Sequence, residues 1–320
     1  MKILVAPLNW GLGHASRCVP LIRRFLAEGH EVILGGDGES LTLLRRHFPT
    51  LRYTYLAPLQ LRYSQSNRQV LAMMRAIPQL ILWAIKDHAM LAGILREEHI
   101  DRVVSDNRFG LYNSAAECVY LTHQLHIFLP RGWRWAERIA QSLHARIYKR
   151  YDKVWVPDYA ELPKSLSGEL GHPNHVSCPI EYIGPLSRFE KLVSDIAHPS
   201  HVYDVVAVLS GLEPQRTMLE QEIRNRYAGG KEKVLIVQGL MNKPNTRIKR
   251  ANVTIVPYMD DKEMAEVLLC AKHIIARSGY STVMDMEALG VMHKAQLIPT
   301  PGQPEQEYLA QWIKQRENEE

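Results

Sequence analysis

The fold of this chain follows from residues 276–290, which read ARSGYSTVMDMEALG. The apolar segment His273–Ala276 leads into them and predicts a strand that is buried on both faces. The Arg-Ser-Gly that follows predicts a tight turn, and the stretch after it has the composition of a helix. A strand, a turn and a helix in this order are the repeating unit of a doubly wound α/β sheet.

The same turn carries groups that suit a nucleotide. Hydroxyls at Ser278, Ser281 and Thr282 would surround a helix N-terminus, where free N–H groups favour a phosphate. Asp285 falls one to two turns into that helix, and an acid in such a position accepts hydrogen bonds from ribose hydroxyls in many nucleotide sites. We therefore predict that this turn binds a diphosphate and its pentose.

Strand and helix patterns alternate along nearly the whole chain, with helical patterns such as Ser16–Glu28 and Leu41–His47. The expected strands are Lys2–Ala6, Glu31–Leu34, Arg52–Tyr55, Arg102–Ser105, His126–Leu129, Lys153–Val156, Tyr203–Leu209, Lys233–Gln238, Val253–Val256, His273–Ala276 and Ala295–Ile298. Most are unbroken apolar runs, as in parallel sheets covered on both faces. The chain is predicted to be an α/β protein with two Rossmann-like, doubly wound domains facing each other across a cleft.

A stretch with little periodicity, Pro157–Pro185, separates the two halves. Its prolines and glycines are typical of a linker. We expect a first domain of residues 1–184, linker included, and a second domain of residues 185–320. A chain of 320 residues is long enough for both.

Composition narrows the partners and the compartment. The net charge of +5 suits an anionic partner such as a nucleotide diphosphate or an acidic membrane surface, and it is too small to indicate nucleic-acid binding. The four cysteines show no Cys-x-x-Cys spacing, which disfavours disulfides and zinc and favours a cytoplasmic protein. No apolar run reaches the roughly 18 residues of a membrane span, and the N-terminus reads as a strand rather than a signal peptide.

A glycine loop follows the first expected strand and carries a candidate base. Residues 9–17 read NWGLGHASR, so Gly11 and Gly13 allow a tight turn before a helix. His14 could take a proton from an attacking hydroxyl, because imidazole accepts protons near neutral pH. Arg17 belongs to the same acceptor-side loop. A glycine turn with a capping histidine is the alternative interpretation.

Two further polar residues are expected near strand ends of the first half. Asp106 follows an expected strand and is the second candidate for the base, after His14. His123 precedes the strand expected at His126–Leu129 and would line the cleft. A capping carboxylate and a structural histidine are equally compatible with these positions.

Two loops of the second half add candidate donor-binding groups. After Tyr203–Leu209, the residues Ser210, Gly211 and Arg216 could donate hydrogen bonds to a diphosphate, although an ordinary helix start explains them as well. The later loop, residues 298–308, reads IPTPGQPEQEY and gathers Gln303, Glu305, Gln306 and Glu307, which are suited to sugar hydroxyls.

At these residues the sequence resembles the GT-B glycosyltransferases of family 28, which includes the peptidoglycan UDP-N-acetylglucosamine transferase and plant galactolipid synthases. The block from Pro257-Tyr258-Met259 through Arg277-Ser278-Gly279 to Gln306-Glu307-Tyr308 resembles that family's donor site in order and spacing. The Gly11–His14 loop is a weaker match to its acceptor side.

The resemblance implies a UDP-sugar donor, inverting single displacement, no cofactor and no required metal. The backbone at Tyr258 and Met259 would hold uracil, and Gln306 and Glu307 the donor sugar. The diphosphate and ribose would be held by Arg277, Ser278, Gly279, Ser281, Thr282 and Asp285.

The sequence departs from the family pattern in several places. Asp285 stands where glutamate is usual, and Glu307 where glutamine is common. The glycine loop is shorter than in the peptidoglycan enzyme. The chain also stops soon after Tyr308, where GT-B proteins usually continue with helices that return to the first domain, so we expect a truncated end or a different domain closure.

The leading hypothesis is transfer of a sugar from a UDP-sugar, UDP-N-acetylglucosamine-like, to a hydroxyl of a glycan or lipid-linked acceptor. A nucleotide-sugar hydrolase and a non-catalytic nucleotide-sugar-binding subunit are the alternatives. The segment RGWRW at residues 131–135, with Arg138, His144, Arg146, Lys149 and Arg150 after it, resembles an interfacial segment for anionic lipid. The apolar stretch Val70–Leu95 is better explained as a core helix. We expect a cytoplasmic protein at the inner membrane face.

Overall fold

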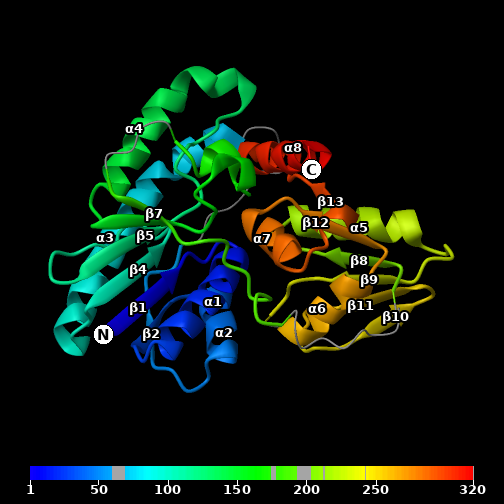
Figure 1. Ribbon diagram of the computed structural model, residues 1–320, viewed down its shortest axis with the longest axis horizontal. Coiled ribbons are helices and arrows are strands. Elements are labelled where there is room, and N and C mark those ends of the chain that lie inside the picture. The colour runs from blue at the N-terminus through cyan, green and yellow to red at the C-terminus, as the bar shows by residue number, and fades with distance from the viewer. Residues whose placement is uncertain (60–68, 174–177, 193–202, 212, 242, 320) are drawn as a thin grey trace.

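The computed structural model describes residues 1–59, 69–173, 178–192, 203–211, 213–241 and 243–319 of the 320-residue chain (Figure 1). Two separate β-sheets, each flanked by helices, lie side by side and confirm the predicted α/β class with two doubly wound domains. The boundary expected at residue 184 falls between the last strand of one sheet and the first strand of the other.

The first sheet has the strand order β3-β2-β1-β4-β5-β6-β7, and every neighbouring pair is parallel. Its central strands are buried on both faces and mostly apolar, which explains why they read as nearly unbroken apolar runs in the sequence. The strands are β1 (Lys2–Pro7), β2 (Glu31–Gly36), β3 (Tyr53–Tyr55), β4 (Arg102–Asp106), β5 (Glu117–Leu121), β6 (Lys153–Val156) and β7 (Ile180–Tyr182).

The second sheet has the order β10-β11-β9-β8-β12-β13 and is parallel except for the antiparallel pair β10–β11. Its strands are β8 (Val205–Val208), β9 (Val234–Val237), β10 (Ile248–Arg250), β11 (Val253–Val256), β12 (His273–Arg277) and β13 (Ala295–Ile298). The helices of the two domains are α1 (Gly13–Ala27), α2 (Gly38–His47), α3 (Gln69–Glu98), α4 (Glu137–Tyr148), α5 (Gln215–Tyr227), α6 (Asp261–Cys270), α7 (Tyr280–Ala288) and α8 (Pro304–Glu319).

The strand order reverses at one point in each sheet, and these points place the site. In the first sheet it reverses between β1 and β4, and in the second between β8 and β12. Ligands of open parallel sheets bind beyond the carboxyl ends of the strands at such a switch point. Three of the loops that the sequence singled out for chemistry follow β1, β8 and β12, and these three lie at switch points, whereas the loop at residues 298–308 follows the edge strand β13.

The strand expected at His126–Leu129 is wrong, and the true strand lies at Glu117–Leu121. The backbone N–H groups of Ile127 and Leu129 donate to side chains of Gln141 and Glu137 rather than to a neighbouring strand. The short strands β7 and β10 were also missed, because neither is a continuous apolar run.

Part of the predicted linker is instead firmly structured. Asp158 is fully buried, and its carboxylate accepts hydrogen bonds from the backbone of Leu166 and from the hydroxyl and backbone of Ser167. Two 3-10 turns, Leu162–Lys164 and Gly168–Leu170, form around it. Proline and glycine marked turns here, but these turns belong to the body of the first domain.

The last helix, α8, packs back onto the first domain (Figure 1). The Trp312 indole N–H donates to the Ser165 carbonyl, and the Tyr308 hydroxyl accepts from the Glu169 N–H. A Cβ on Gly168 would lie 2.4 Å from the Tyr308 hydroxyl, so only glycine permits this approach. The helix α8 itself therefore makes a contact back to the first domain.

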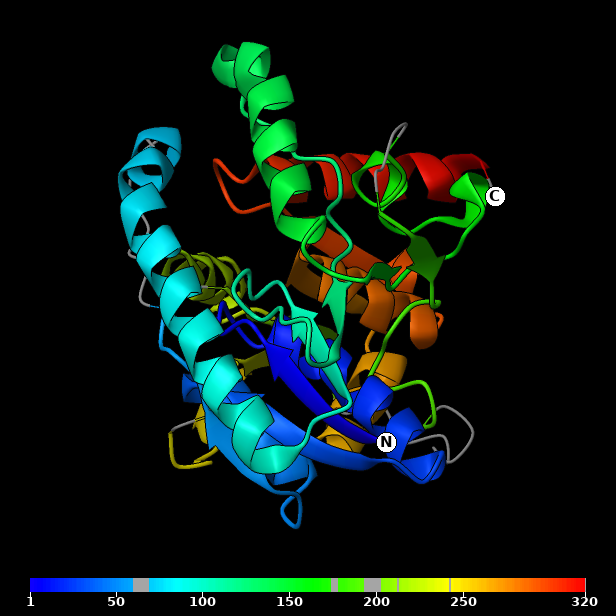
Figure 2. The same ribbon diagram turned by 90° about the vertical axis from the view of Figure 1, so that its left-hand side faces the viewer.

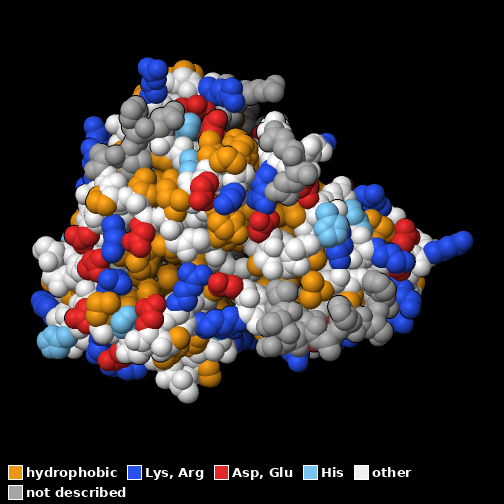
Figure 3. All heavy atoms as spheres, viewed as in Figure 1, with side chains coloured by type: hydrophobic (Ala, Val, Ile, Leu, Met, Phe, Trp, Pro, Cys, Tyr) orange, Lys and Arg blue, Asp and Glu red, His pale blue; other side chains and the backbone are white. Residues whose placement is uncertain are grey.

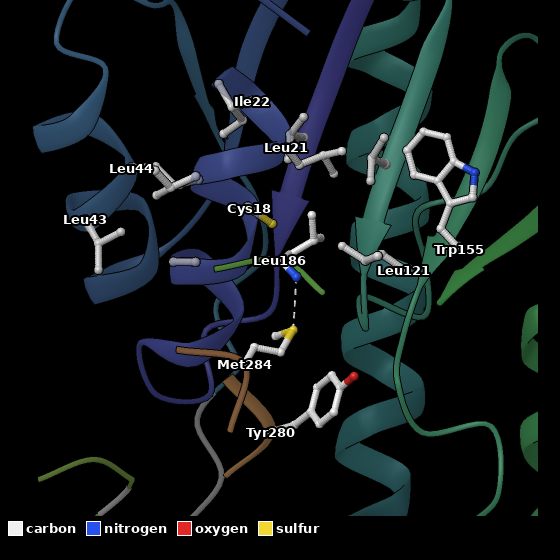
Figure 4. Packing of buried hydrophobic residues seen from close by; sticks show 14 of the residues in the cluster. Cys18, Leu21, Ile22, Leu43, Leu44, Leu121, Trp155, Leu186, Tyr280 and Met284 are labelled. Carbon is white, nitrogen blue, oxygen red and sulfur yellow. Dashed lines mark hydrogen bonds between the residues drawn. The ribbon is translucent and has the colours of Figure 1, made fainter. Parts of the chain in front are cut away.

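Apolar packing between the domains continues along α7. Tyr280, Val283 and Met284 belong to the same buried cluster as the inner face of α1. The Tyr280 hydroxyl donates to the Pro157 carbonyl of the first domain, and Figure 4 shows Met284 beside Leu186 of its own domain, whose backbone nitrogen lies 3.2 Å from the methionine sulfur. The start of α7 is thus held against the first domain rather than exposed to bulk water.

Candidate active site

A cavity of about 640 Å³ lies where the two switch points meet. This volume is in the range of small-molecule sites. A Cβ on Gly11 would lie 4.0 Å from the Cα of Gly211, so the glycine loops of the two domains face each other closely. The cavity is lined by Asn9, Trp10, Gly11, Leu12, Gly13, Ser16, Glu39, Leu59, Arg188, Phe189, Val208, Leu209, Ser210, Gly211, Glu213, Arg216, Val237, Gly239, Met241, Tyr258, Met259, Met264, Leu268, Ser281, Thr282, Asp285 and Met286.

The N-terminus of α7 opens into this cavity. Ser281 and Thr282 line it, and none of the described residues accepts a hydrogen bond from the N–H groups of Tyr280, Ser281 or Thr282. A Cβ on Gly13 would lie 2.4 Å from the Ser281 Oγ, so the first-domain loop also approaches closely. The predicted anion site is therefore neither filled by its own side chains nor turned away from the other domain.

Asp285 lies beside that helix start, in a buried but polar setting. Its Oδ1 accepts from the Ser187 hydroxyl at 2.7 Å, and its Oδ2 lies 3.6 Å from the Arg188 Nε. Burial raises the pKa of Asp285 to about 6, against the lowering effects of Arg188 and of the Ser187 hydrogen bond. Ser187 and Arg188 carry no recognisable signal in the sequence, because they lie in a segment without a motif and far from α7 in the chain.

Tyr258 and Met259, predicted to hold a base, also line the cavity. No described residue hydrogen-bonds to their backbone N–H or C=O groups, so these groups are available to the edge of a base. The Tyr258 ring lies against Arg46 of α2, whose guanidinium carbon is 4.4 Å from the ring centroid. The first domain therefore closes one side of this region.

The loop after β8 is less available than predicted. Ser210, Gly211 and Arg216 all line the cavity. However, the Arg216 guanidinium pairs with Glu213 at 2.7 Å, and the same carboxylate accepts from the Thr217 N–H at the start of α5. The N-terminus of α5 is therefore already occupied by the Glu213 carboxylate, whereas no carboxylate of the described residues occupies the N-terminus of α7.

Arg277 and Ser278 do not line the cavity. The Arg277 guanidinium donates to the carbonyls of Pro299 and Gln215, and burial lowers the pKa of Arg277. The Ser278 hydroxyl donates to the Gln306 carbonyl and is fully buried. Both side chains hold the loops around the site together rather than offering donors to a diphosphate.

Gly279, Gln306 and Glu307 also lie outside the cavity lining. Gly279 forms the N-cap of α7. The Gln306 side chain bonds within its own loop, to the Thr300 N–H and to Gln303. Glu307 is exposed. The structure therefore places neither predicted sugar ligand in contact with the cavity.

His14 stands at the edge of the cavity, between the lining residues Gly13 and Ser16 on the first turns of α1. Its Nδ1 lies 2.9 Å from the Asp106 Oδ1. Its Nε2 has no hydrogen-bond partner in the described part of the chain, and the side chain is 17% exposed. An Nδ1–H donated to Asp106 would leave Nε2 as a proton acceptor facing a substrate.

Asp106 is the last residue of β4, paired in register with Pro7 of β1. It is fully buried, so it orients His14 and cannot itself touch an acceptor, which corrects its prediction as a second base. Arg17 donates to both of its oxygens, through Nε at 2.8 Å and through Nη2. Burial alone would raise the pKa of Asp106, but the charges of Arg17 and His14 lower it well below its usual value.

His123 does not line the cavity but joins this network from the end of β5. Its Nδ1 lies 2.9 Å from the Arg17 Nη1, and its Nε2 lies 2.9 Å from the Oε1 of Glu305 on α8. The ring also stacks on Tyr280 at 4.2 Å. Glu305 was predicted only as a sugar partner, and nothing in the sequence connects it to a residue 182 positions earlier.

No group of three or more His, Cys, Asp and Glu side chains is arranged around a metal-sized space in the ranges that the structure describes. Helices in those ranges are also all too short or too polar to span a bilayer.

No family model matches the chain. It is 26% identical to an uncharacterized glycosyltransferase of Methanosarcina acetivorans, over 96% of this chain and 82% of that protein. Among solved structures it resembles the spinosyn forosaminyltransferase SpnP, with a TM-score of 0.57, 16% identity and coverage of 100% of this chain and 95% of the other.

Two further structures share the fold. Phytolacca americana UGT2, complexed with UDP-2-fluoro-glucose and pterostilbene, has a TM-score of 0.55 and 14% identity, over 98% of this chain and 83% of that one. MurG of Acinetobacter baumannii has a TM-score of 0.51 and 13% identity, over 98% and 82%. On this fold and these relatives, the chain is a glycosyltransferase with the GT-B architecture.

Proposed function

We propose that the chain transfers a sugar from a UDP-sugar, such as UDP-N-acetylglucosamine, to a hydroxyl of a glycan or lipid-linked acceptor. The proposal keeps the family 28 resemblance, and it includes inversion at the anomeric carbon and independence from metal ions. One observation carries it: the N-terminus of α7 lines the cavity from the second domain, and His14, which is paired with the buried Asp106, lies at the edge of that cavity between the lining residues Gly13 and Ser16.

The donor is assigned from the second-domain side of the cavity. The amides at the start of α7 would bind the diphosphate, and Asp285 would accept from the ribose hydroxyls. The backbone at Tyr258 and Met259 would read the base. A UDP-sugar is supported by the plant neighbour of the same fold, which is complexed with UDP-2-fluoro-glucose.

The chemistry is a single displacement. The His14 Nε2 takes the proton of the acceptor hydroxyl, and the acceptor oxygen bonds to the anomeric carbon as the bond to the β-phosphate oxygen breaks. The leaving UDP gains negative charge, which the helix N-terminus stabilises. Asp106 stabilises the imidazolium that forms on His14. Attack opposite the leaving group inverts the anomeric centre.

Nucleotide preference tests the donor assignment. Thermal unfolding is measured with UDP, GDP, TDP and their sugars at one common concentration, about one hundred times the dissociation constant of UDP, where binding of UDP adds about 2.7 kcal/mol to stability. We expect the response to be largest for UDP compounds and to persist in EDTA. Transfer to an added acceptor, rather than release of UDP and free sugar alone, separates a transferase from a hydrolase. No response to any nucleotide would contradict the proposal.

The acceptor is proposed to lie at a membrane, because apolar and basic side chains are exposed together on one side of the first domain. The first half of α3 and the region of α4 project from that side (Figure 2). Basic and apolar side chains lie next to each other near the end that carries α4 (Figure 3). The exposed large apolar residues there are Ile77, Ile81, Leu82, Ile85, Trp135, Ile139 and Leu143.

Two details of this surface differ from the sequence prediction. The stretch expected as a core helix buries only one side of α3, with Trp83 and Leu91 inside and Ile81 and Leu82 outside. His144 is buried, and burial lowers its pKa to about 4, so it adds no positive charge near neutral pH. Arg134, Arg138, Arg146, Lys149 and Arg150 are exposed, as a surface for anionic lipid requires.

Binding to lipid vesicles tests the membrane proposal. We expect binding to phosphatidylglycerol vesicles at low salt and its loss in about 0.5 M salt, because lipid charge is screened within a few ångströms there. The double substitution Ile81→Ser and Leu82→Ser should weaken binding several-fold, whereas Met218→Ser, an exposed apolar residue on α5, should not. Equal binding by all variants, or none by the unchanged protein, would exclude this surface.

A further inference from the structure

His123 is held between the two domains by contacts on three sides. Its ring stacks on Tyr280, the first residue of α7, at 4.2 Å with an interplanar angle of 4°. Its Nε2 meets Glu305 in the first turn of α8, and its Nδ1 meets Arg17 of α1. Two of these three neighbours come from the second domain, so the position of His123 depends on how that domain is seated.

The contacts fix where the protons lie. Arg17 has donors only, so the Nδ1 of His123 must accept from it, and the ring proton must sit on Nε2 and point to Glu305. Burial lowers the pKa of His123, against the raising effect of Glu305, which agrees with a neutral ring. The Nε and Nη2 of Arg17 then serve Asp106, which accepts the Nδ1–H of His14.

A single line of hydrogen bonds therefore runs from Glu305 to His14. Arg17 Nη2 also lies 2.9 Å from the His14 Nδ1. The His14 Nδ1 carries a proton that it donates to Asp106, so it does not accept from Arg17. The two nitrogens lie close together because both donate to the same oxygen, the Oδ1 of Asp106. If Arg17 shifted away from Asp106, its Nη2 could donate to the His14 Nδ1 and force the proton to Nε2, where His14 could no longer act as a base.

We propose that Glu305 and His123 are positioning residues that make His14 competent only when α7 and α8 are seated on the first domain. The proposal rests on the proposed function, in which His14 is the base. Without the Glu305 carboxylate, the His123 Nε2–H has no acceptor. The other tautomer would then turn an N–H toward the Arg17 guanidinium and displace it from Asp106. The position of α7 and α8 on the first domain thereby determines whether His14 can act as the base.

The alternative role for Glu305 is direct contact with the donor sugar. It is testable because a sugar ligand and a positioning residue affect different kinetic constants. Loss of a sugar ligand raises the KM for the donor, whereas loss of a positioning residue lowers kcat with little change in KM.

The experiment compares Glu305→Ala, Glu305→Gln and the control Glu317→Ala, an exposed carboxylate on the same helix. We expect Glu305→Ala to lower kcat about tenfold, a loss of the size seen when the partner that orients a metal-ligating histidine is removed, with donor KM within about twofold. Glu305→Gln should retain most of kcat, because its amide oxygen can still accept from Nε2–H. A raised donor KM with unchanged kcat would overturn the proposal.

A second measurement does not depend on activity. Ring ¹⁵N spectra of the intact chain should show His123 as the Nε2–H tautomer and His14 as the Nδ1–H tautomer. In Glu305→Ala both should change, and in Glu305→Gln and Glu317→Ala both should stay. Unchanged His14 signals in Glu305→Ala would exclude the link. Absence of sugar transfer by the unchanged protein, with these spectral changes present, would instead refute the proposed function alone.

Discussion

Replacement of His14 by alanine is expected to lower kcat for sugar transfer by about two to four orders of magnitude, the usual contribution of a general base. The acceptor hydroxyl is a poor nucleophile until its proton is removed, and the Nε2 of His14, to which no described residue hydrogen-bonds, lies at the edge of the cavity. Asp106 cannot replace it, because that carboxylate is fully buried. Binding of UDP should change little, since the donor-side groups belong to the other domain.

The measurement is kcat at saturating donor, together with UDP affinity by titration calorimetry. His293→Ala serves as the control, because His293 is an exposed histidine of the second domain. Undiminished transfer by His14→Ala would contradict the assignment of the base. UDP binding without any transfer by the unchanged protein would favour a non-catalytic nucleotide-sugar-binding subunit.

Local signals in the sequence were sufficient for the parts of the site that lie at strand ends. The turn after β12 was predicted from its small residues and hydroxyls, and the loop after β1 from its glycines. Both are short-range patterns, and strand order then brings them to switch points without further information. The same reasoning explains why Ser281, Asp285 and Gly13 line one cavity.

Contacts between distant segments could not be predicted in this way. Arg277 resembles a phosphate ligand in sequence, but the neighbouring backbone carbonyls that take its donors are visible only in the folded chain. Asp106 was expected at a strand end, yet its burial and its ion pair with Arg17, which lies 89 positions away, are visible only in the folded chain. The link between His123 and Glu305 depends on α8 packing against the first domain, for which the sequence has no local signal.

Replacement of Asp285 is expected to change stability and nucleotide affinity in opposite directions. Asp285→Ala removes an acceptor for the ribose, and two charge-assisted hydrogen bonds of about 1.5 kcal/mol each correspond to about a hundredfold weaker UDP binding. Asp285→Asn should unfold at a higher temperature than the unchanged protein at pH 7.5. Calorimetric titration with UDP and thermal unfolding measure the two effects, with exposed Glu232→Gln as the control.

The sign of the stability change follows from the pKa. Burial raises the pKa of Asp285 from its ordinary 3.8 to about 6, so the folded chain holds this proton more tightly than the unfolded chain. Stability from this group therefore falls as pH rises from about 4 to about 6, by about 2–3 kcal/mol in all. Asparagine carries no charge, so its variant escapes that loss. The advantage of Asp285→Asn should be present above pH 6 and vanish near pH 4.

Nucleotide binding should show the opposite pH dependence. Ribose hydroxyls that donate to Asp285 favour its charged form, so UDP binds more weakly as pH falls below about 6 and the carboxyl becomes protonated. Asp285→Asn should lose this dependence. The charged Asp285 destabilises the folded chain at neutral pH, and binding of the UDP ribose to this charge explains why the chain carries it. UDP affinity that is flat from pH 5 to 8, or unchanged in Asp285→Ala, would remove that explanation and with it the ribose assignment.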